Sequence, residues 1–566
     1  MRLLCFFIFF IVFKVSSSQN INLNESFIER YFRDIQLLNE LDTKTSFTIR
    51  PISLSNYEIS DDSYKNIFSD IIESKNKEIK LSLLPIDYIF DYNSHHPYNR
   101  NNGTLIPNRG YQHLISLGIF AKIGPLEIQI KPEHHFAENL SFNGFWDGHY
   151  DAIWAKRYIG WNRSDIPERF GNARINQELI GQSSVKLKFK KISIGISNEN
   201  LWWGPSLRNS IMLSNHARSF KHISFETHKP INTKIGLIEW QFVTGRLELS
   251  GFKPPGSDRT FQGQKLWIPE HNQARQGPDW RYFQGLIFTY NPKWLKNFYI
   301  GTIRWAQLYG GFLQGEYNWL DEKPGYFPLF TSLFKTSPDL ADVGSQIDEA
   351  GGFFFRWLMK ESATEIYAEY HFNDAKVNLR DLFLDSKHSR AVTIGFRKAF
   401  KNKRDKDFIF SYEWTQMEQS GSRIIREAGS WYYHFMINSG YTNHGEVMGS
   451  AIGPGSNSHY FEILKHDEKY RASFSFEIVD VDNDFYYLAF ESAQDFRRYW
   501  KDLNFKIGFE KKFKNIWLST NLLYQRSLNY QWQLDDYVEP YYHPGKDVNN
   551  FHANFKIIYS IPKLKN

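Results

Sequence analysis

Two adjacent tryptophans, followed by a turn and two polar side chains, form the segment of this sequence best suited to bind a ligand. The run 198–210 contains, in order, Trp202, Trp203, Gly204, Pro205, Arg208 and Asn209. Indole rings can stack on the apolar faces of sugar rings, while a guanidinium and an amide supply hydrogen bonds. We therefore predict a ligand-binding role for Trp202, Trp203, Arg208 and Asn209. The alternative is structural: the loop folds inward and the two indoles pack as a plug.

Two pairs of adjacent histidines raise the question of a metal site. They are His95-His96 and His134-His135, and adjacent side chains on a strand project in opposite directions, so such a pair rarely binds one ion. The single cysteine is Cys5, and no His-Glu-x-x-His motif occurs. We expect structural histidines, no metal site and no cofactor.

The acidic run that begins at Asp480 resembles the start of a calcium loop. Asp482 and Asp484 follow at the expected spacing, and Glu491 stands eleven residues after Asp480. Phe485 replaces the glycine that such a loop needs at its sharp turn, so a loop between strands fits this segment better. No phosphate-binding Gly-x-x-x-x-Gly-Lys-Ser/Thr motif and no Gly-x-Ser-x-Gly motif occurs. We predict that the protein is not an enzyme.

Composition excludes several classes of protein. Phe, Tyr and Trp make up 17% of the 566 residues, which is incompatible with a disordered chain. The mean hydropathy of −0.50 excludes a bundle of membrane-spanning helices. The net charge of +6, spread over this length, does not indicate nucleic-acid binding.

The first eighteen residues have the pattern of a secretory signal peptide. Arg2 precedes the apolar stretch 3–13, and small residues occupy the positions before a cut after Ser18. Removal of residues 1–18 takes away Cys5, so the mature chain would hold no cysteine and would depend on burial and hydrogen bonding for its stability.

Residues 19–85 and residues 86–566 differ in their periodicity. Apolar residues recur at helical spacing over 24–41 and 62–75, with a short strand at 46–50, which predicts a small helical lid over 19–85. After Pro85 the period becomes two, as where Val185, Leu187 and Phe189 alternate with lysines.

Residues 86–566 contain about eighteen segments with this strand pattern, and long and short connections alternate between them. Long loops at one rim and short turns at the other are typical of an antiparallel outer-membrane barrel, with both termini in the periplasm. A secreted propeller or sandwich is the alternative, but no repeat of 40–50 residues is evident.

Several motifs resemble those of the Wzi family of outer-membrane capsule-assembly proteins. They are the tryptophan run 198–210 and the segments 93–98, 106–110, 167–171 and 451–458. The resemblance implies an eighteen-stranded barrel, closed by helices at the periplasmic side, in the outer membrane of a Gram-negative (diderm) bacterium. It also implies a lectin-like protein that attaches or organises capsular polysaccharide at the cell surface. The chain departs from the usual aromatic end of a barrel, because it continues past Tyr559 to Asn566.

The expected partners are capsular or surface polysaccharide and outer-membrane lipid, with no nucleic acid, and the expected state is a monomer. Two other functions fit parts of the pattern. A porin or transport channel would use the polar lumen, and a glycan hydrolase would need a catalytic carboxylate pair in a cleft.

Overall fold

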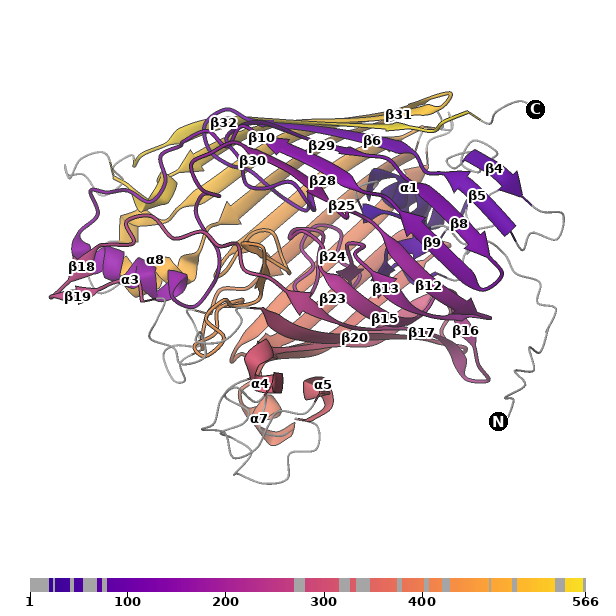
Figure 1. Cartoon of the computed structure of the whole chain (residues 1–566), viewed down its shortest axis with the longest axis horizontal. Coiled ribbons are helices and arrows are strands. Elements are labelled where there is room, and N and C mark those ends of the chain that lie inside the picture. The colour runs from indigo at the N-terminus through magenta and orange to yellow at the C-terminus, as the bar shows by residue number, and fades with distance from the viewer. Residues whose placement is uncertain are drawn as a thin grey trace, which may run out of the picture.

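The computed structural model describes residues 20–23, 26–40, 45–53, 69–73, 79–268, 280–314, 326–331, 347–373, 379–401, 407–419, 428–467, 470–490, 496–534 and 545–562. The predicted signal peptide lies outside these residues. One large antiparallel sheet dominates the structure (Figure 1). None of the helices in the described ranges combines the length and the apolar character that crossing a bilayer requires.

Most of the sheet consists of strands that pair with their neighbours in chain order. These strands are β12 (Ser184–Phe189), β13 (Ile192–Ser197), β15 (Lys221–Thr227), β17 (Gly236–Leu247), β20 (Arg281–Pro292), β21 (Phe298–Tyr309), β22 (Asp348–Met359), β23 (Thr364–Asn373), β24 (Arg390–Lys401), β25 (Asp407–Gln416), β28 (Asn457–His466), β29 (Tyr470–Asp480), β30 (Lys501–Phe513), β31 (Ile516–Leu528) and β32 (Val548–Tyr559).

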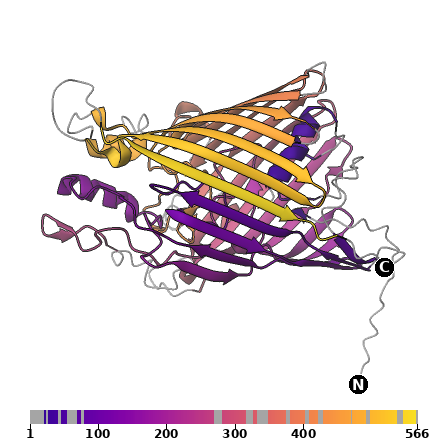
Figure 2. The same cartoon turned by 90° about the horizontal axis from the view of Figure 1, so that it is seen from above.

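The N-terminal part of the sheet is built from shorter pieces. They are β4 (Ser69–Glu73), β5 (Ile79–Leu83), β6 (Ile86–Asn93), β7 (Gly110–Ser116), β8 (Ile119–Ile123), β9 (Leu126–Ile130), β10 (Glu133–Ala137) and β11 (Ile175–Leu179). Strand β5 pairs with β8, and β6 pairs with β7. The segments β5–β6 and β7–β8 thus form one long hairpin that is interrupted in the middle. Pro85, which has no N–H to donate, lies at one such break. The last strand, β32, pairs with β6, and the sheet curves back towards its beginning (Figure 2).

Side chains along many of the strands alternate between an apolar outer face and an inner face that is mostly polar. Val185, Leu187 and Phe189 are 48%, 40% and 57% exposed, whereas Lys186 between them is buried. The ammonium of Lys186 lies 2.9 Å from the carboxylate of Glu199 and is also bonded to a second inner glutamate. This arrangement is the reverse of a water-soluble protein and confirms the alternation predicted from the sequence.

Two predictions about the N-terminal segment are wrong. The helix predicted over 24–41 exists as α1 (Ser26–Leu37), but the helix predicted over 62–75 is wrong, because β4 is a strand and residues 54–68 lie outside the described part. The boundary at Pro85 is also wrong, since β4 and β5 already belong to the main sheet. The strand predicted over 46–50 is the short β2 (Ile49–Arg50).

The two ends of the sheet carry different elements. Helices α3 (Asp151–Trp161) and α8 (Asn483–Phe490) lie at one end, and α1, β4 and β5 lie at the other (Figures 1 and 2). The remaining short helices also belong to the longer connections: α4 (Gly310–Gln314), α5 (Pro328–Thr331), α7 (Leu379–Leu384), and the 3₁₀ turns Phe496–Arg498 and Tyr530–Trp532. Small ladders are formed by β1 (Asn20–Ile21) with β3 (Ile52–Ser53), β14 (Trp202–Trp203) with β2, β16 (Ile231–Asn232) with β17, β18 (Thr260–Phe261) with β19 (Gln264–Lys265), and β26 (Thr442–Asn443) with β27 (Glu446–Val447).

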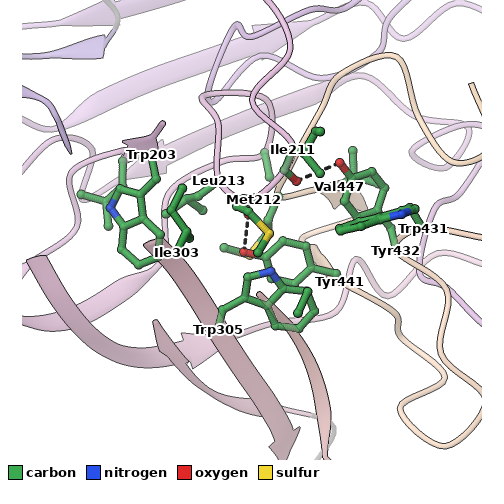
Figure 3. Packing of buried hydrophobic residues seen from close by; sticks show 14 of the residues in the cluster. Trp203, Ile211, Met212, Leu213, Ile303, Trp305, Trp431, Tyr432, Tyr441 and Val447 are labelled. Carbon is green, nitrogen blue, oxygen red and sulfur yellow. Dashed lines mark hydrogen bonds between the residues drawn. The ribbon is translucent and has the colours of Figure 1, made fainter. Parts of the chain in front are cut away.

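Part of the space enclosed by the sheet is filled by a packed apolar core. Inward side chains such as Ile303 and Trp305 meet apolar residues of two long connections, and Trp305 stacks on Tyr441 with ring centroids 3.9 Å apart (Figure 3). The hydroxyl of Tyr432 donates to the Ile211 carbonyl at 2.9 Å, and that of Tyr441 donates to the Met212 carbonyl at 2.7 Å. The long connections thus fold inward and join the core.

Candidate functional site

The tryptophan run predicted to bind a ligand lies inside the sheet, in a connection that we call the lumenal loop (residues 198–218). Its strand β14 pairs with β2 of the N-terminal segment, with Trp203 opposite Ile49. Trp203 is fully buried, and its indole N–H donates to Gln241 at 2.6 Å. Gly285 on β20 makes room for this ring, because a Cβ there would lie 2.5 Å from the indole.

Two carboxylates of the sheet hold the backbone of the lumenal loop. Glu413 accepts hydrogen bonds from the backbone N–H groups of Leu207, Arg208 and Asn209, at 2.7, 3.1 and 2.7 Å. Glu369 accepts another from the backbone N–H of Ser206 at 2.9 Å. Successive N–H groups of this kind form an anion-binding concavity, and here the protein fills it with its own glutamates.

Gly204 shows why the turn of the lumenal loop needs its glycine. Its φ is +96°, and a Cβ at this position would lie 2.3 Å from the Glu369 carboxylate. Both the backbone conformation and the available space therefore exclude a side chain.

The N-terminal segment binds the lumenal loop on the opposite side from these carboxylates. The Arg50 guanidinium donates to the carbonyls of Gly204 and Ser206 at 2.8 and 2.9 Å, and lies 4.4 Å from the centre of the Trp202 ring. Burial raises the pKa of Glu29, although its ion pair with Arg50 at 3.4 Å opposes that shift. One face of Trp202 is thus already covered by a cation.

The four predicted residues therefore do not share one surface. Trp203 and Asn209 have no exposed surface, and the Asn209 amide donates to Ser458 at 2.9 Å. Trp202 and Arg208 line a cavity of about 240 Å³ between α1, the lumenal loop and the inner face of β28 to β32. Burial alone would lower the pKa of Arg208, but Glu477 and nearby tyrosines raise it well above its usual range. This burial favours the structural alternative, in which the loop packs inside the sheet as a plug.

Helix α1 is fixed in the lumen by a buried network of ion pairs. Glu365 on β23 accepts hydrogen bonds from Arg33 of α1, Arg356 and Arg397, at 3.0, 2.7 and 2.9 Å. Asp34, the next residue of α1, forms ion pairs with Arg397 and with Arg471 on β29. The apolar face of α1 packs on strand ends through Phe27, Ile28 and Phe32, among others.

A second aromatic group lies at the end with the long connections, and the sequence did not single it out. This rim cluster comprises Phe145, Ile153, Trp154, Tyr158, Trp161, Phe485, Tyr486, Ala489, Phe490 and Trp532. Beside it, Trp146 and Tyr150 are 40% and 79% exposed. The high density of aromatic residues between 145 and 161 is the sequence feature that could have indicated this cluster.

Charged side chains lie next to these two aromatic residues. Arg259 pairs with Asp147 at 3.0 Å and with Asp151 at 3.5 Å, and its guanidinium lies 4.0 Å from the centre of the Trp154 ring. The Trp146 ring is positioned edge-on to His149, with centroids 5.3 Å apart. Exposed rings next to donors and acceptors are the combination that binds sugar rings.

The histidine and acidic motifs have structural partners. Burial lowers the pKa of His96 to about 3, and its ring contacts Gln525 at 2.9 Å. Asp482 pairs with Arg157 at 2.9 Å, and the Asp484 carboxylate accepts from the Gln419 backbone N–H at 2.7 Å. Glu491 lies outside the described residues. Within the described ranges, no group of three potential metal ligands is found.

Known proteins resemble this chain in sequence pattern and in fold. The family model described as capsule assembly protein Wzi matches residues 122–531. A search of curated proteins gave no match. The solved structure of Wzi from Escherichia coli, an outer-membrane protein described as a carbohydrate-binding β-barrel involved in group 1 capsule assembly, is 11% identical, with a TM-score of 0.58, over 96% of this chain and 99% of that one.

Two other solved structures have lower TM-scores. DcaP, an outer membrane channel of Acinetobacter baumannii, is 10% identical, with a TM-score of 0.28, over 87% of this chain and 99% of that one. OccAB2 of the same organism is 8% identical, with a TM-score of 0.37, over 84% and 98%. The family model covers more than half of the chain, and the fold is that of a β-barrel. This protein therefore belongs to the Wzi family of capsule assembly proteins and resides in the outer membrane of a Gram-negative bacterium.

Proposed function

We propose that this protein holds capsular polysaccharide at the cell surface as a plugged barrel, not as a channel and without catalysis. The family and the likeness to a carbohydrate-binding barrel support the polysaccharide as partner. The observation that carries the proposal is the rim: two exposed aromatic side chains beside charged groups, on a rigid aromatic base, at the end with the long connections.

The proposed barrel is closed and has eighteen strands. This count treats β5 with β6, β7 with β8, β9 with β10, and β11 with β12 as one strand each, and adds the fourteen longer strands that follow. The pairing of β32 with β6 supports closure. A closed barrel leaves no edge strand and satisfies its backbone groups in lipid. The proposed state is a monomer.

We assign the N-terminal segment, described at residues 20–23, 26–40 and 45–53, to a periplasmic plug. Its α1 is tied to the inner wall by the Glu365 and Asp34 networks. The lumenal loop and the connection around Trp431 and Tyr441 also pack together inside the sheet. Among the described residues, these two fillings narrow the lumen, which argues against transport.

The polysaccharide contact is proposed at Trp146 and Tyr150, with Asp147, Asp151 and Arg259 as hydrogen-bonding neighbours. The test compares cell-attached with shed capsule in a deletion strain complemented with the wild type or with a Trp146→Ala/Tyr150→Ala variant. Loss of attachment by the variant, at equal barrel yield, supports the rim as the site. Full attachment by the variant contradicts it. Release of oligosaccharides from capsule by purified protein would contradict a role without catalysis.

A further inference from the structure

The wall of the barrel is interrupted beside β11, at the point where the lumenal loop leaves the sheet. Strand β12 pairs with β9 on one side and with β13 on the other. Strand β11, which is continuous with β12 in the eighteen-strand barrel, pairs only with β10 among the described residues. The neighbour that it lacks would be a longer β13, but β13 ends at Ser197 and the chain turns into the lumen. A strand edge without a neighbour leaves backbone N–H and C=O groups that need another partner.

A cavity of about 760 Å³ lies at this interruption. Its lining comes from the end of β11, from both ends of the lumenal loop, and from the facing ends of β15 and β17, and it includes Glu178, Asn198, Arg218, Ser219, Lys221 and Arg246. The cavity opens to the outside of the barrel, because the side chain of Glu178 at its edge is 79% exposed. Its volume falls in the range of about 300–1,000 Å³ that is usual for small-molecule sites.

The outer surface changes from apolar to polar at the level of this cavity. Val185 and Ile180 are 48% and 52% exposed, and the next outward residue along the same strand is Glu178. On β15 the same change falls between Ile223, which is 49% exposed, and the exposed Lys221. Because β11 directly follows the long connection that carries α3, this is the extracellular boundary of the apolar band. The cavity therefore faces the headgroup layer of the outer leaflet.

Two cations stand side by side at the outer edge of the cavity. Lys221 of β15 and Arg246 of β17 are directly opposite each other in the strand register. Arg246 pairs with Glu248 at 2.5 Å, and its side chain is 53% exposed, whereas Lys221 forms no hydrogen bond or ion pair with the described residues. Cations at the depth of lipid headgroups attract anionic headgroup oxygens.

The inner part of the cavity is rich in hydrogen-bonding groups. The Asn198 amide donates to the Gly181 carbonyl at 2.8 Å and to the Ser219 hydroxyl at 2.9 Å. The Arg218 guanidinium reaches across the interruption to the Gln177 side chain of β11, at 3.4 Å. Among the described lining residues, three are arginines or lysines and three are glutamates. Charges of both signs beside amide and hydroxyl groups suit a sugar that carries hydroxyls and phosphate, rather than a bare anion.

We propose that this cavity binds the phosphorylated sugar headgroup of an outer-leaflet glycolipid, lipopolysaccharide, from the side of the membrane. Lys221 and Arg246 meet the phosphate, and the groups around Asn198 and Arg218 meet the sugar hydroxyls. The acyl chains lie on the apolar outer face below, where Ile180 and Ile223 are exposed. The headgroup thus fills the interruption in the wall and supplies polar partners to the free edge of β11. This site is separate from the rim and does not depend on the proposed polysaccharide contact.

The test adds lipid A, the acylated and phosphorylated sugar of lipopolysaccharide, to the purified full-length barrel in detergent. Native mass spectrometry and thermal unfolding are compared with those for phosphatidylglycerol at equal charge. Lipid A should bind saturably and raise the melting temperature, because a ligand bound by the folded state alone stabilises that state. Equal saturable binding of phosphatidylglycerol would overturn the proposal, since it would show attraction to any anionic lipid. Displacement of lipid A by capsular oligosaccharide would also overturn it, because the cavity would then belong to the polysaccharide.

The Lys221→Gln/Arg246→Gln variant should bind lipid A at least tenfold more weakly and lose the rise in melting temperature. Both side chains are exposed, so the yield of folded barrel should not change. The matched control is Lys501→Gln/Arg526→Gln, which removes the same charge at the extracellular ends of β30 and β31, where these side chains are 43% and 37% exposed. The control should retain wild-type binding. Wild-type binding by the first variant, or an equal loss in the control, would refute the assignment.

Discussion

The lumenal loop and the rim cluster are both rich in aromatic residues, and both belong to long connections, yet their surroundings differ. In the lumenal loop, Trp203 is buried and hydrogen-bonded to Gln241, and the backbone after it is held by Glu413. At the rim, Trp146 and Tyr150 expose large parts of their rings beside paired charges. The difference teaches that tryptophan in a surface-loop sequence indicates ligand binding only when no other part of the chain covers it.

Removal of the N-terminal plug should give the largest effect. Without residues 20–53, the lumenal loop loses Arg33 and Arg50 as well as its β14–β2 pairing. We expect conductance in planar bilayers to rise clearly above the wild-type value, although the lumenal loop keeps its contacts with Glu369 and Glu413 of the sheet. The wild-type barrel and a variant cut before residue 20 are the controls. Unchanged conductance in a correctly inserted barrel would show that this segment does not close the lumen.

Glu365→Ala should cause a large loss of stability for a single substitution. It leaves Arg33, Arg356 and Arg397 facing one another in a buried space. Breaking a buried ion pair costs about 3–5 kcal/mol, because uncompensated charge remains. Urea unfolding in detergent measures the loss, and Glu361→Ala, at an exposed turn position, is the matched control. Equal stability of the two variants would contradict a clamping role for the network.

Trp203→Ala should come next, at about 3–5 kcal/mol, the usual cost of truncating a buried tryptophan. It empties the space under Gly285 and leaves Gln241 without its donor. The same unfolding assay applies, with Trp294→Ala as the control, because Trp294 is 79% exposed at the end with the short turns. A Trp203 variant as stable as the control would show that the indole does not support the plug.

The rim variants should change stability least and binding most. Tyr150→Ala removes mainly exposed surface, so it should alter the free energy of unfolding by less than about 0.5 kcal/mol. Trp146 is 40% exposed, so Trp146→Ala should cost more than Tyr150→Ala but much less than Trp203→Ala. A ring stack contributes about 1 kcal/mol beyond its buried area, so each variant should bind capsule several-fold more weakly and the double variant about tenfold or more. Sedimentation of labelled capsule with barrels in vesicles measures this. Weakened binding by Trp294→Ala to the same degree would remove the rim from consideration.

Much of the barrel follows from local patterns in the sequence. A period of two with apolar residues outside predicts strands such as β30 and β31 within a few residues, and helical spacing predicts α1. The helix predicted over 62–75 fails because a short apolar run such as Ile71-Ile72 satisfies the helical and the strand pattern alike, and pairing with β5 decides between them.

The candidate site could not be predicted to the same extent. The local run Trp202-Trp203-Gly204-Pro205 is compatible with an exposed or a buried loop. What buries it lies far away in the chain: Glu369 and Glu413 hold its backbone, and Arg50 covers one ring. No spacing within the run encodes these partners. Trp146 and Tyr150 were missed because their exposure depends on the packing of α3 against α8, which are more than 300 residues apart.

The most direct test compares Trp203→Ala with Trp146→Ala/Tyr150→Ala in the same cells, measuring capsule attachment per folded barrel together with melting temperature. A structural lumenal loop and a binding rim predict opposite outcomes. Trp203→Ala should lower the melting temperature and leave attachment per folded barrel unchanged, whereas the rim variant should lower the melting temperature much less and lose attachment. Lost attachment per folded barrel in Trp203→Ala, with full attachment in the rim variant, would contradict the account.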